Sequence, residues 1–408
     1  MPENPKPNSL TGVVSSLYIH VPFCQSKCHY CDFYSIDGAD DELFRLWHET
    51  IKTEIKRLAW EADVAGVRIC PLKTVYYGGG TPSLVPIEFL LEELDLCRKL
   101  FGINQNAEIT LEANPEQIYS AEIAADWLSA GFNRLSIGLQ SASDHLLSLM
   151  GRRHTREDAL RAVMNASAAG FSNISLDLIS GLPDAEMEDI EDTLSFIADL
   201  PLTHLSVYAL DIPYGSVFAK MQAQENQRFP DDLKERKMFH RIKQAVTARG
   251  FKHYEISNFA LDSFQSQHNL VYWRAEPYLA AGPAASSYLA GIRRSNPASL
   301  QKWQQSVTDS GPFSENTITE IITEDEALCE TMLLGLRLLE GVHYSDVMQR
   351  HGKDFRVIFA AQIEDLTSKN LLDFDGETLR LTQMGEDYCN IVFREFVSLD
   401  TNTKTSSN

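Results

Sequence analysis

The sequence lacks any apolar run that reaches the roughly 18 residues a helix needs to cross a membrane. Hydrophobic residues make up 44% and charged residues 23% of its 408 residues, the ordinary balance of a soluble globular chain. The first stretch, MPENPKPNSLTGVV, is polar and proline-rich, so it resembles neither a signal peptide nor a transit peptide. We expect a cytoplasmic protein without a membrane span, which leaves peripheral membrane contact open.

Positive charge is also scarce. Lys and Arg together number 36 against 57 Asp and Glu, which gives a formal net charge of −21. An extended nucleic-acid surface needs clustered Lys and Arg, because binding is driven largely by the release of counterions from phosphates. We therefore expect no nucleic-acid partner and attribute the acidic excess to solubility.

A fourth cysteine is missing at the one place where cysteines gather. The segment CQSKCHYC holds Cys24, Cys28 and Cys31, and Phe33 stands two residues beyond the third. An odd total of seven cysteines favours reduced thiols in the cytosol. The remaining four are scattered and are interpreted as packing residues: Cys70, Cys97, Cys329 and Cys389.

From residue 15 onward, short β-branched runs alternate with longer helical patterns. The predicted strands are 15–21, 73–80, 107–114, 133–140, 173–183, 204–213 and 252–259. Strands that alternate with helices indicate parallel strands joined by crossover helices, and six or more units favour a full or partial barrel over an open sheet. We predict an α/β fold with a partial (β/α) barrel over 15–300, and disordered tails at 1–14 and 401–408.

Beyond residue 300 the pattern changes. TEDEALCETMLLGLRLLEGV is an amphipathic helix capped by Thr323, and helices near 344–351 and 355–369 follow. The Asp-Gly pair in LLDFDGETLRLTQMG predicts a hairpin turn, and a last helix, EDYCNIVFREFV, follows it. These elements predict a small α+β, winged-helix-like domain over 301–400, for which the acidic composition favours protein packing or a lid role over DNA binding.

Unusual residues fall at the ends of the predicted strands. In a parallel barrel the carboxyl ends of the strands share one face, where ligand-binding and catalytic residues collect. The sequence therefore predicts the site at this face, with these residues at or just beyond strand ends: Cys24, Gly79, Thr81, Glu112, Gln140 and Asp177.

The cysteine trio favours an iron–sulfur cluster. Thiolates hold such clusters, usually four at a time, so three ligands on a [4Fe–4S] cluster leave one iron open to a further ligand. An open coordination position is what a catalytic metal site needs. The alternative is a zinc site with His20 or His29 as the fourth ligand.

CQSKCHYC resembles the C-x3-C-x-aromatic-C signature of the radical S-adenosylmethionine (SAM) superfamily. YIHVPFC, YYGGGTPS, TLEANPE, RLSIGLQS, GRRH, SLDLISGLP, YEISNFA and HNLVYW follow the order of its oxygen-independent coproporphyrinogen III oxidase group, over about residues 15–290. The resemblance implies a [4Fe–4S] cluster on the three cysteines, SAM chelating the open iron, and an electron donor.

The resemblance also implies how SAM is held. The loop with Gly79, Gly80 and Thr81 would meet the amino group of SAM, and Arg152, next to Arg153, would pair with its carboxylate. The residues expected at the amino and ribose groups are Glu112, Gln140 and Asp177. Tyr18 would contact SAM and Tyr30 would lie beside the adenine, although either ring could instead fill the core.

Two functional classes remain within the group. The oxidases carry a fourth cysteine where this chain has Phe33, whereas the C-D-F pattern resembles HemW-type proteins, which bind heme and deliver it to acceptor proteins. In HNLVYW, His268 is then the candidate heme ligand, with a hydrogen-bonded core histidine as the alternative. A radical SAM enzyme acting on tRNA is a third class, which the net charge disfavours.

One segment departs from the group. Where the group commonly shows G-x-G-A-H-[SG], this chain reads AGPAASSY, with Ala284 at the second glycine and Ser286 at the histidine. The missing imidazole removes a ligand or acid that a substrate could use. We therefore predict a HemW-type heme carrier, with coproporphyrinogen III oxidase as the alternative.

Overall fold

The computed structural model of the chain describes residues 13–64, 66–308 and 318–399. The tail predicted at 401–408 and nearly all of the tail predicted at 1–14 lie outside these residues. None of the helices formed by the described residues is both long and apolar enough to cross a membrane.

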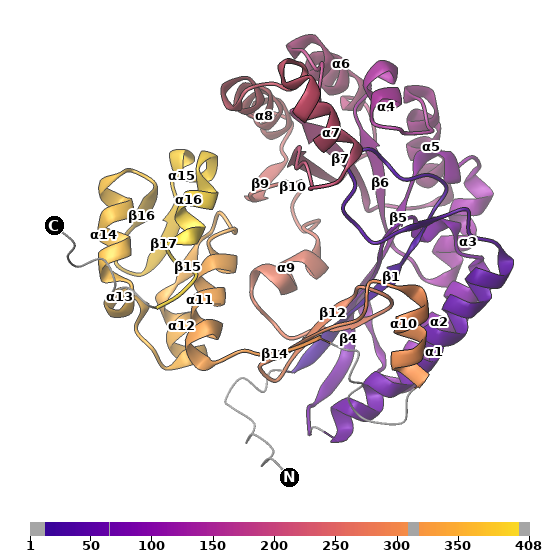
Figure 1. Ribbon diagram of the computed structural model, residues 1–408, viewed down its shortest axis with the longest axis horizontal. Coiled ribbons are helices and arrows are strands. Elements are labelled where there is room, and N and C mark those ends of the chain that lie inside the picture. The colour runs from indigo at the N-terminus through magenta and orange to yellow at the C-terminus, as the bar shows by residue number, and fades with distance from the viewer. Residues whose placement is uncertain (1–12, 65, 309–317, 400–408) are drawn as a thin grey trace.

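Within the described residues, nine strands form one sheet in the order β11-β1-β4-β5-β6-β7-β8-β10-β9. The bounds are β1 Val14–Val21, β4 Ile69–Gly79, β5 Ile103–Ala113, β6 Arg134–Gln140, β7 Ile174–Ser180, β8 His204–Ala209, β9 Lys252–Glu255, β10 Asn258–Ala260 and β11 Leu279–Ala281. Every pair from β11 to β8 is parallel. The sheet curves toward a barrel (Figure 1). Its two edge strands, β11 and β9, are not paired with each other among the described residues, so the barrel is open.

Crossover helices cover the outer face of this sheet (Figure 1). They are α1 Asp41–Val64, α2 Ile87–Leu100, α3 Ala121–Ala130, α4 Asp144–Leu149, α5 Arg156–Ala169, α6 Met187–Ile197, α7 Val217–Gln224 and α8 Asp232–Thr247. Local signals set their ends: α5 begins with a capping box between Thr155 and Asp158 and stops at Gly170, whose φ is 106°. The structure confirms the predicted partial (β/α) barrel.

The strands alternate between an apolar face and a polar face. Leu111, Leu135 and Leu176 belong to the core under the helices, whereas Glu112, Ser136 and Asp177 line a cavity inside the barrel. Because successive side chains of a strand point to opposite faces, one stretch of sequence supplies both the core and the inner wall. The inner wall is therefore where the strands can present polar groups to a ligand.

The segment 252–259, predicted as one further strand of the series, is instead a hairpin. β9 and β10 pair antiparallel with each other, and β10 pairs antiparallel with β8. The side chain of Asn258 donates a hydrogen bond to that of Glu255 across the turn. No glycine or proline marks this reversal, and Ser257 with Asn258 is only a weak turn signal.

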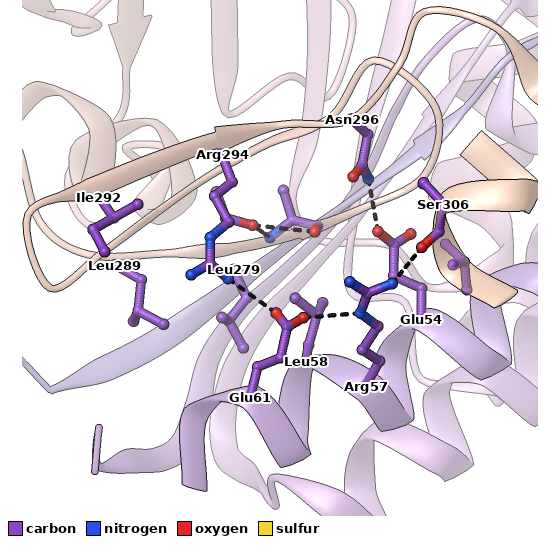
Figure 2. Close-up of a pocket in the computed structure, with 13 residues that line it drawn as sticks. Glu54, Arg57, Leu58, Glu61, Leu279, Leu289, Ile292, Arg294, Asn296 and Ser306 are labelled. Atoms are coloured by element: carbon purple, nitrogen blue, oxygen red, sulfur yellow. Dashed lines mark hydrogen bonds and ion pairs between the residues drawn. The ribbon is translucent and has the colours of Figure 1, made fainter. Parts of the chain in front are cut away.

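A second small sheet follows the barrel. β12 (Ser286–Leu289), β13 (Ile292–Ser295) and β14 (Ile318–Ile321) pair antiparallel, and α10 (Leu300–Thr308) lies between β13 and β14 in the chain. This second small sheet and α10 pack on α1 around a cavity of about 50 Å³ (Figure 2). It runs across residue 300, where we expected a domain boundary, and that boundary stays a prediction.

The C-terminal unit has its own core of buried residues, which includes Leu328, Phe355 and Phe359. Its elements are α11 Glu324–Gly335, β15 Val342–His343, α12 Tyr344–His351, α13 Phe355–Ile358, α14 Ala360–Ser368, β16 Leu372–Phe374, β17 Thr378–Leu381, α15 Gln383–Asp387 and α16 Cys389–Arg394. As predicted, Thr323 caps α11, and β16 and β17 form an antiparallel hairpin. The helix expected at 355–369 is divided into α13 and α14.

Candidate functional site

The three clustered cysteines lie in a loop bracketed by two short strands. β2 (Phe23–Cys24) and β3 (Ile36–Asp37) pair in parallel and close the loop at its base. Backbone hydrogen bonds tie its middle to the barrel, since His29 N donates to Met150 O at 3.0 Å and Phe218 N donates to His29 O at 3.1 Å. All three thiols face one cavity of about 450 Å³ at the carboxyl ends of the strands.

The donor set fits an iron–sulfur cluster better than a single ion. Among the described residues, no three His, Cys, Asp or Glu side chains are grouped tightly enough to hold one metal ion. The ring of His20, one histidine considered for zinc, is hydrogen-bonded to Tyr18 Oη and Tyr34 O, each at 3.0 Å. In a cluster each thiolate binds a different iron, so the sulfurs need not converge on a point.

The glycine loop, residues 78–81, packs closely against the start of the cysteine loop. Gly79 has φ 110°, and a Cβ there would lie 2.4 Å from His20 Cε1. A Cβ on Gly80 would lie 2.6 Å from the carbonyl oxygen of Phe23. Thr81 N donates to that same oxygen at 2.7 Å, which fixes the two loops together. Only glycine fits these two positions without displacing His20 or Phe23, and contact of the loop with SAM stays a prediction.

Two carboxylates stand on the inner wall of the cavity. Glu112 accepts hydrogen bonds from Tyr76 Oη at 2.7 Å and Gly79 N at 3.0 Å. Burial, together with the nearby charge of Asp177, raises the pKa of Glu112 to about 7. Burial also raises the pKa of Asp177, which lies in the middle of β7 and therefore deeper than the strand end where we placed it.

Arg152 lines the cavity, and part of its guanidinium is already hydrogen-bonded to the protein. Its Nη2 donates to Asn114 Oδ1 at 2.9 Å and to Gly138 O at 2.7 Å, and its Nη1 lies 3.6 Å from Cys28 Sγ. Its Nε is buried and has no hydrogen-bond partner among the described residues. A buried N–H without a partner suits a bound carboxylate.

The other predicted SAM residues divide into two groups. Gln140, Gly80 and Tyr30 line the cavity beside the three cysteines. Tyr18 does not line it. Its ring stacks on that of Tyr76 at 6.1 Å between centroids, beneath the glycine loop.

His268 lies outside this cavity. It stands on α9 (Gln267–Trp273), and its two ring nitrogens are hydrogen-bonded to Thr74 Oγ1 and Tyr272 Oη, each at 2.8 Å. The residue is 1% exposed, and burial, reinforced by the positive charge of Arg134, lowers its pKa to about 3. In this conformation it is a hydrogen-bonded core histidine, the alternative that the sequence left open.

Sequence reasoning missed part of the cavity wall. Asn114 directly follows the predicted strand in TLEANPE, so its position at a strand end could have drawn attention to it. Phe33 lines the cavity and is 62% exposed as a residue. Other wall residues that it missed include Ser136, Ile179, Tyr208, Leu210, Asp211 and Pro213.

Comparison with known proteins identifies the fold and the family. Residues 18–197 match the model of the radical SAM superfamily, and residues 322–386 match that of the HemN C-terminal domain. Coproporphyrinogen III oxidase (HemN) from Escherichia coli has a similar structure, with a TM-score of 0.81 at 22% identity, covering 95% of this chain and 92% of that one. That likeness concerns the fold. Together, the barrel and its cysteine loop define a radical SAM protein.

Curated relatives narrow the class. A protein named heme chaperone HemW from Bacillus subtilis is 33% identical, over 94% of this chain and 99% of its own length. Its namesake from Lactococcus lactis is 32% identical, over 95% of this chain and 98% of its own. The chain therefore belongs to the HemW family.

The radical SAM fold implies a [4Fe–4S] cluster and SAM, and the residues present fit both. Three thiols face one cavity, two glycines there admit no side chain, and a buried arginine N–H is left for a carboxylate. Burial raises the pKa of Cys24 and of Cys31, so binding iron would displace protons from these thiols.

Proposed function

We propose that this chain binds heme and transfers it to acceptor proteins, with a [4Fe–4S] cluster and SAM held at the cysteine-lined cavity. The observation that carries the proposal is the family: relatives matched along nearly their whole length are named heme chaperones. Phe33 supports it from within the chain, because a ring, not a fourth thiol, stands exposed at the cavity. An electron donor for the cluster is part of the proposal.

A coproporphyrinogen III oxidase is the second candidate, favoured by the structural likeness to HemN. Two positions argue against it. Phe33 replaces the cysteine that the oxidases carry, and Ser286 replaces the histidine common in the group. Ser286 Oγ is instead hydrogen-bonded to Ser295 Oγ at 2.7 Å, within the second small sheet.

Heme ligation by His268 would require α9 to move. The barrel holds the start of this helix, because Gln267 N and His268 N both donate to the Glu108 carboxylate at 3.1 Å. The C-terminal unit holds its end: the Arg350 side chain donates to the carbonyls of Arg274 and Ala275. Iron could reach His268 only after these contacts open, so we propose that heme loading accompanies displacement of α9.

The experiment is a heme titration of the anaerobically reconstituted chain, read by the Soret band, with and without the cluster. We expect the wild type to bind heme and His268→Ala to lose the axial-ligand spectrum. His204→Ala is the matched control, because His204 is also fully buried, with its nitrogens hydrogen-bonded to Ser175 Oγ at 2.8 Å and Tyr254 Oη at 2.9 Å.

The outcomes separate the candidates. Equal losses in His268→Ala and His204→Ala would show a general packing defect and remove His268 from the heme site. A wild-type chain that binds no heme but converts coproporphyrinogen III would replace the carrier with the oxidase.

A further inference from the structure

Asn114 connects two residues of the cavity that the sequence analysis treated separately. It directly follows β5, and its side chain accepts a hydrogen bond from Arg152 Nη2 at 2.9 Å. Its Nδ2 in turn donates to Thr81 Oγ1 at 3.2 Å. The backbone is held as well, since Gln117 N donates to Asn114 O at 3.0 Å in the short turn that follows. Asn114 therefore bridges a guanidinium and a hydroxyl that belong to different loops.

The direction of each hydrogen bond in the series Arg152–Asn114–Thr81 is fixed. A guanidinium only donates, so the amide oxygen of Asn114 must face Arg152 and its NH2 must face Thr81. Thr81 Oγ1 thus accepts from Asn114, and its own proton is free to point at Cys24 Sγ, 3.7 Å away. At the other end of this hydrogen-bond series, Arg152 Nη1 lies 3.6 Å from Cys28 Sγ.

We propose that Asn114 is a positioning residue that couples the SAM carboxylate clamp to two of the cluster thiolates. Held by Asn114, Arg152 keeps its guanidinium at the cavity, with Nε unpartnered, while its Nη1 reaches Cys28. Held by Asn114, Thr81 directs its hydroxyl at Cys24. Hydrogen bonds to ligating sulfurs stabilise the reduced cluster and raise its reduction potential. The inference rests on the cluster and SAM part of the proposed function, and heme binding does not enter it.

An amide is the one side-chain group of this size that can both accept from Arg152 and donate to Thr81. Leucine at 114 keeps much of the volume but makes neither hydrogen bond. Aspartate still accepts from Arg152 but offers Thr81 only a second acceptor, so the hydroxyl proton turns away from Cys24. The two variants therefore remove different parts of the arrangement.

The test measures the reduction potential of the reconstituted cluster by redox titration followed by electron paramagnetic resonance, and SAM affinity by calorimetry. We expect Asn114→Leu to lower the potential and to weaken SAM binding at least tenfold. Asn114→Asp lowers the potential too, but loses less SAM affinity because Arg152 stays held. Neither readout depends on turnover.

Asn133→Ala is the control. Asn133 binds the middle of β5, accepting from Ile109 N at 2.8 Å and donating to Ala107 O at 2.7 Å, and it does not line the cavity. Wild-type potential and SAM affinity in Asn114→Leu would overturn the inference, as would equal changes in Asn133→Ala. If Asn114→Leu does not fold, Asn114→Asp decides through its potential. A wild-type chain that takes up no cluster would instead overturn the proposed cofactors, and the inference with them.

Discussion

Ala284 occupies a backbone conformation that favours glycine, with φ at 61°. It lies in the loop that starts at Gly282, whose own φ is 107° and whose Cβ, if present, would lie 2.5 Å from His20 O. The loop is fixed by backbone hydrogen bonds, including one from Ala284 N to Pro297 O at 3.1 Å. Because His20 packs against Gly79, the methyl group of Ala284 adds strain close to the glycine loop of the site.

We predict that Ala284→Gly stabilises the protein by about 0.5–1 kcal/mol, since glycine adopts this conformation without a side-chain penalty. Chemical denaturation measures the change. Ala285→Gly is the control: Ala285 is 3% exposed and is not among the positive-φ residues, so its replacement should destabilise by a similar amount. A loss of stability in Ala284→Gly would show that the turn carries no strain.

At the level of single residues, the positions that could be predicted are those whose chemistry requires a fixed spacing along the sequence. The three cysteines, Gly79 and Arg152 all face the cavity, because a short loop or a strand end fixes where each must point. The burial of His268 was not predictable. It depends on which side of α9 faces Thr74, and a helix of seven residues has too few turns for its pattern to decide this.

Among the elements, α1 and α10 are joined to the end of β11 by one buried carboxylate. Glu54 on α1 accepts from Gly282 N at 2.7 Å, Trp303 Nε1 at 2.8 Å and Asn296 Nδ2 at 2.7 Å, as the Asn296 contact in Figure 2 illustrates. Burial raises the pKa of Glu54 to about 7, although these three donors oppose the shift. Glu54 therefore binds its proton more tightly in the folded chain, so its stabilising contribution is complete below pH 4.5 and is lost as the pH rises through about 7.

Trp303→Phe removes one N–H that favours the ionised carboxylate, and it should raise the pKa of Glu54 further. We predict that the variant is destabilised by about 1 kcal/mol more at pH 8 than at pH 5, because the wild-type carboxyl is largely ionised at pH 8 and the variant carboxyl, with its higher pKa, is less so. Denaturation across this pH range measures the difference. Trp60→Phe on α1, at a residue that is 48% exposed, should show little effect at either pH. A pH-independent cost of Trp303→Phe would mean that Glu54 stays protonated.

The elements also show where sequence patterns fail. β1 and β4 to β8 were predictable, because each is a β-branched run followed by a helical pattern. β11 reads Leu-Ala-Ala and β13 reads Ile-Arg-Arg-Ser, and neither has the apolar alternation of a strand. These strands form because a neighbour offers unpaired backbone groups: β11 extends the sheet beside β1, and β13 pairs on both sides.

In the whole molecule, two hydrophobic cores are joined by polar contacts and by a small apolar cluster of Tyr288, Ile322 and Ala327. Buried residues of the barrel and of the C-terminal unit form separate clusters. Between them, Leu339 N donates to Tyr254 O at 3.0 Å, and His240 Nε2 lies 2.7 Å from Asp387 Oδ1. Figure 1 shows the C-terminal unit set beside the open edge of the barrel, with α9 between the two. Because each unit has a hydrophobic core of its own, we expect the two cores to melt as distinct units.

We predict two thermal unfolding transitions, each of which responds to one core only. Phe355→Leu removes packing from the fully buried core of the C-terminal unit and should lower one transition by about 4–8 °C, for a loss near 1 kcal/mol. Phe132→Leu, in the barrel core, should lower the other by about 2–4 °C because that unit is larger. Scanning calorimetry measures both. If each variant moved one shared transition, the contact between the units would be strong enough to couple them, and α9 could not leave the barrel without the whole fold opening.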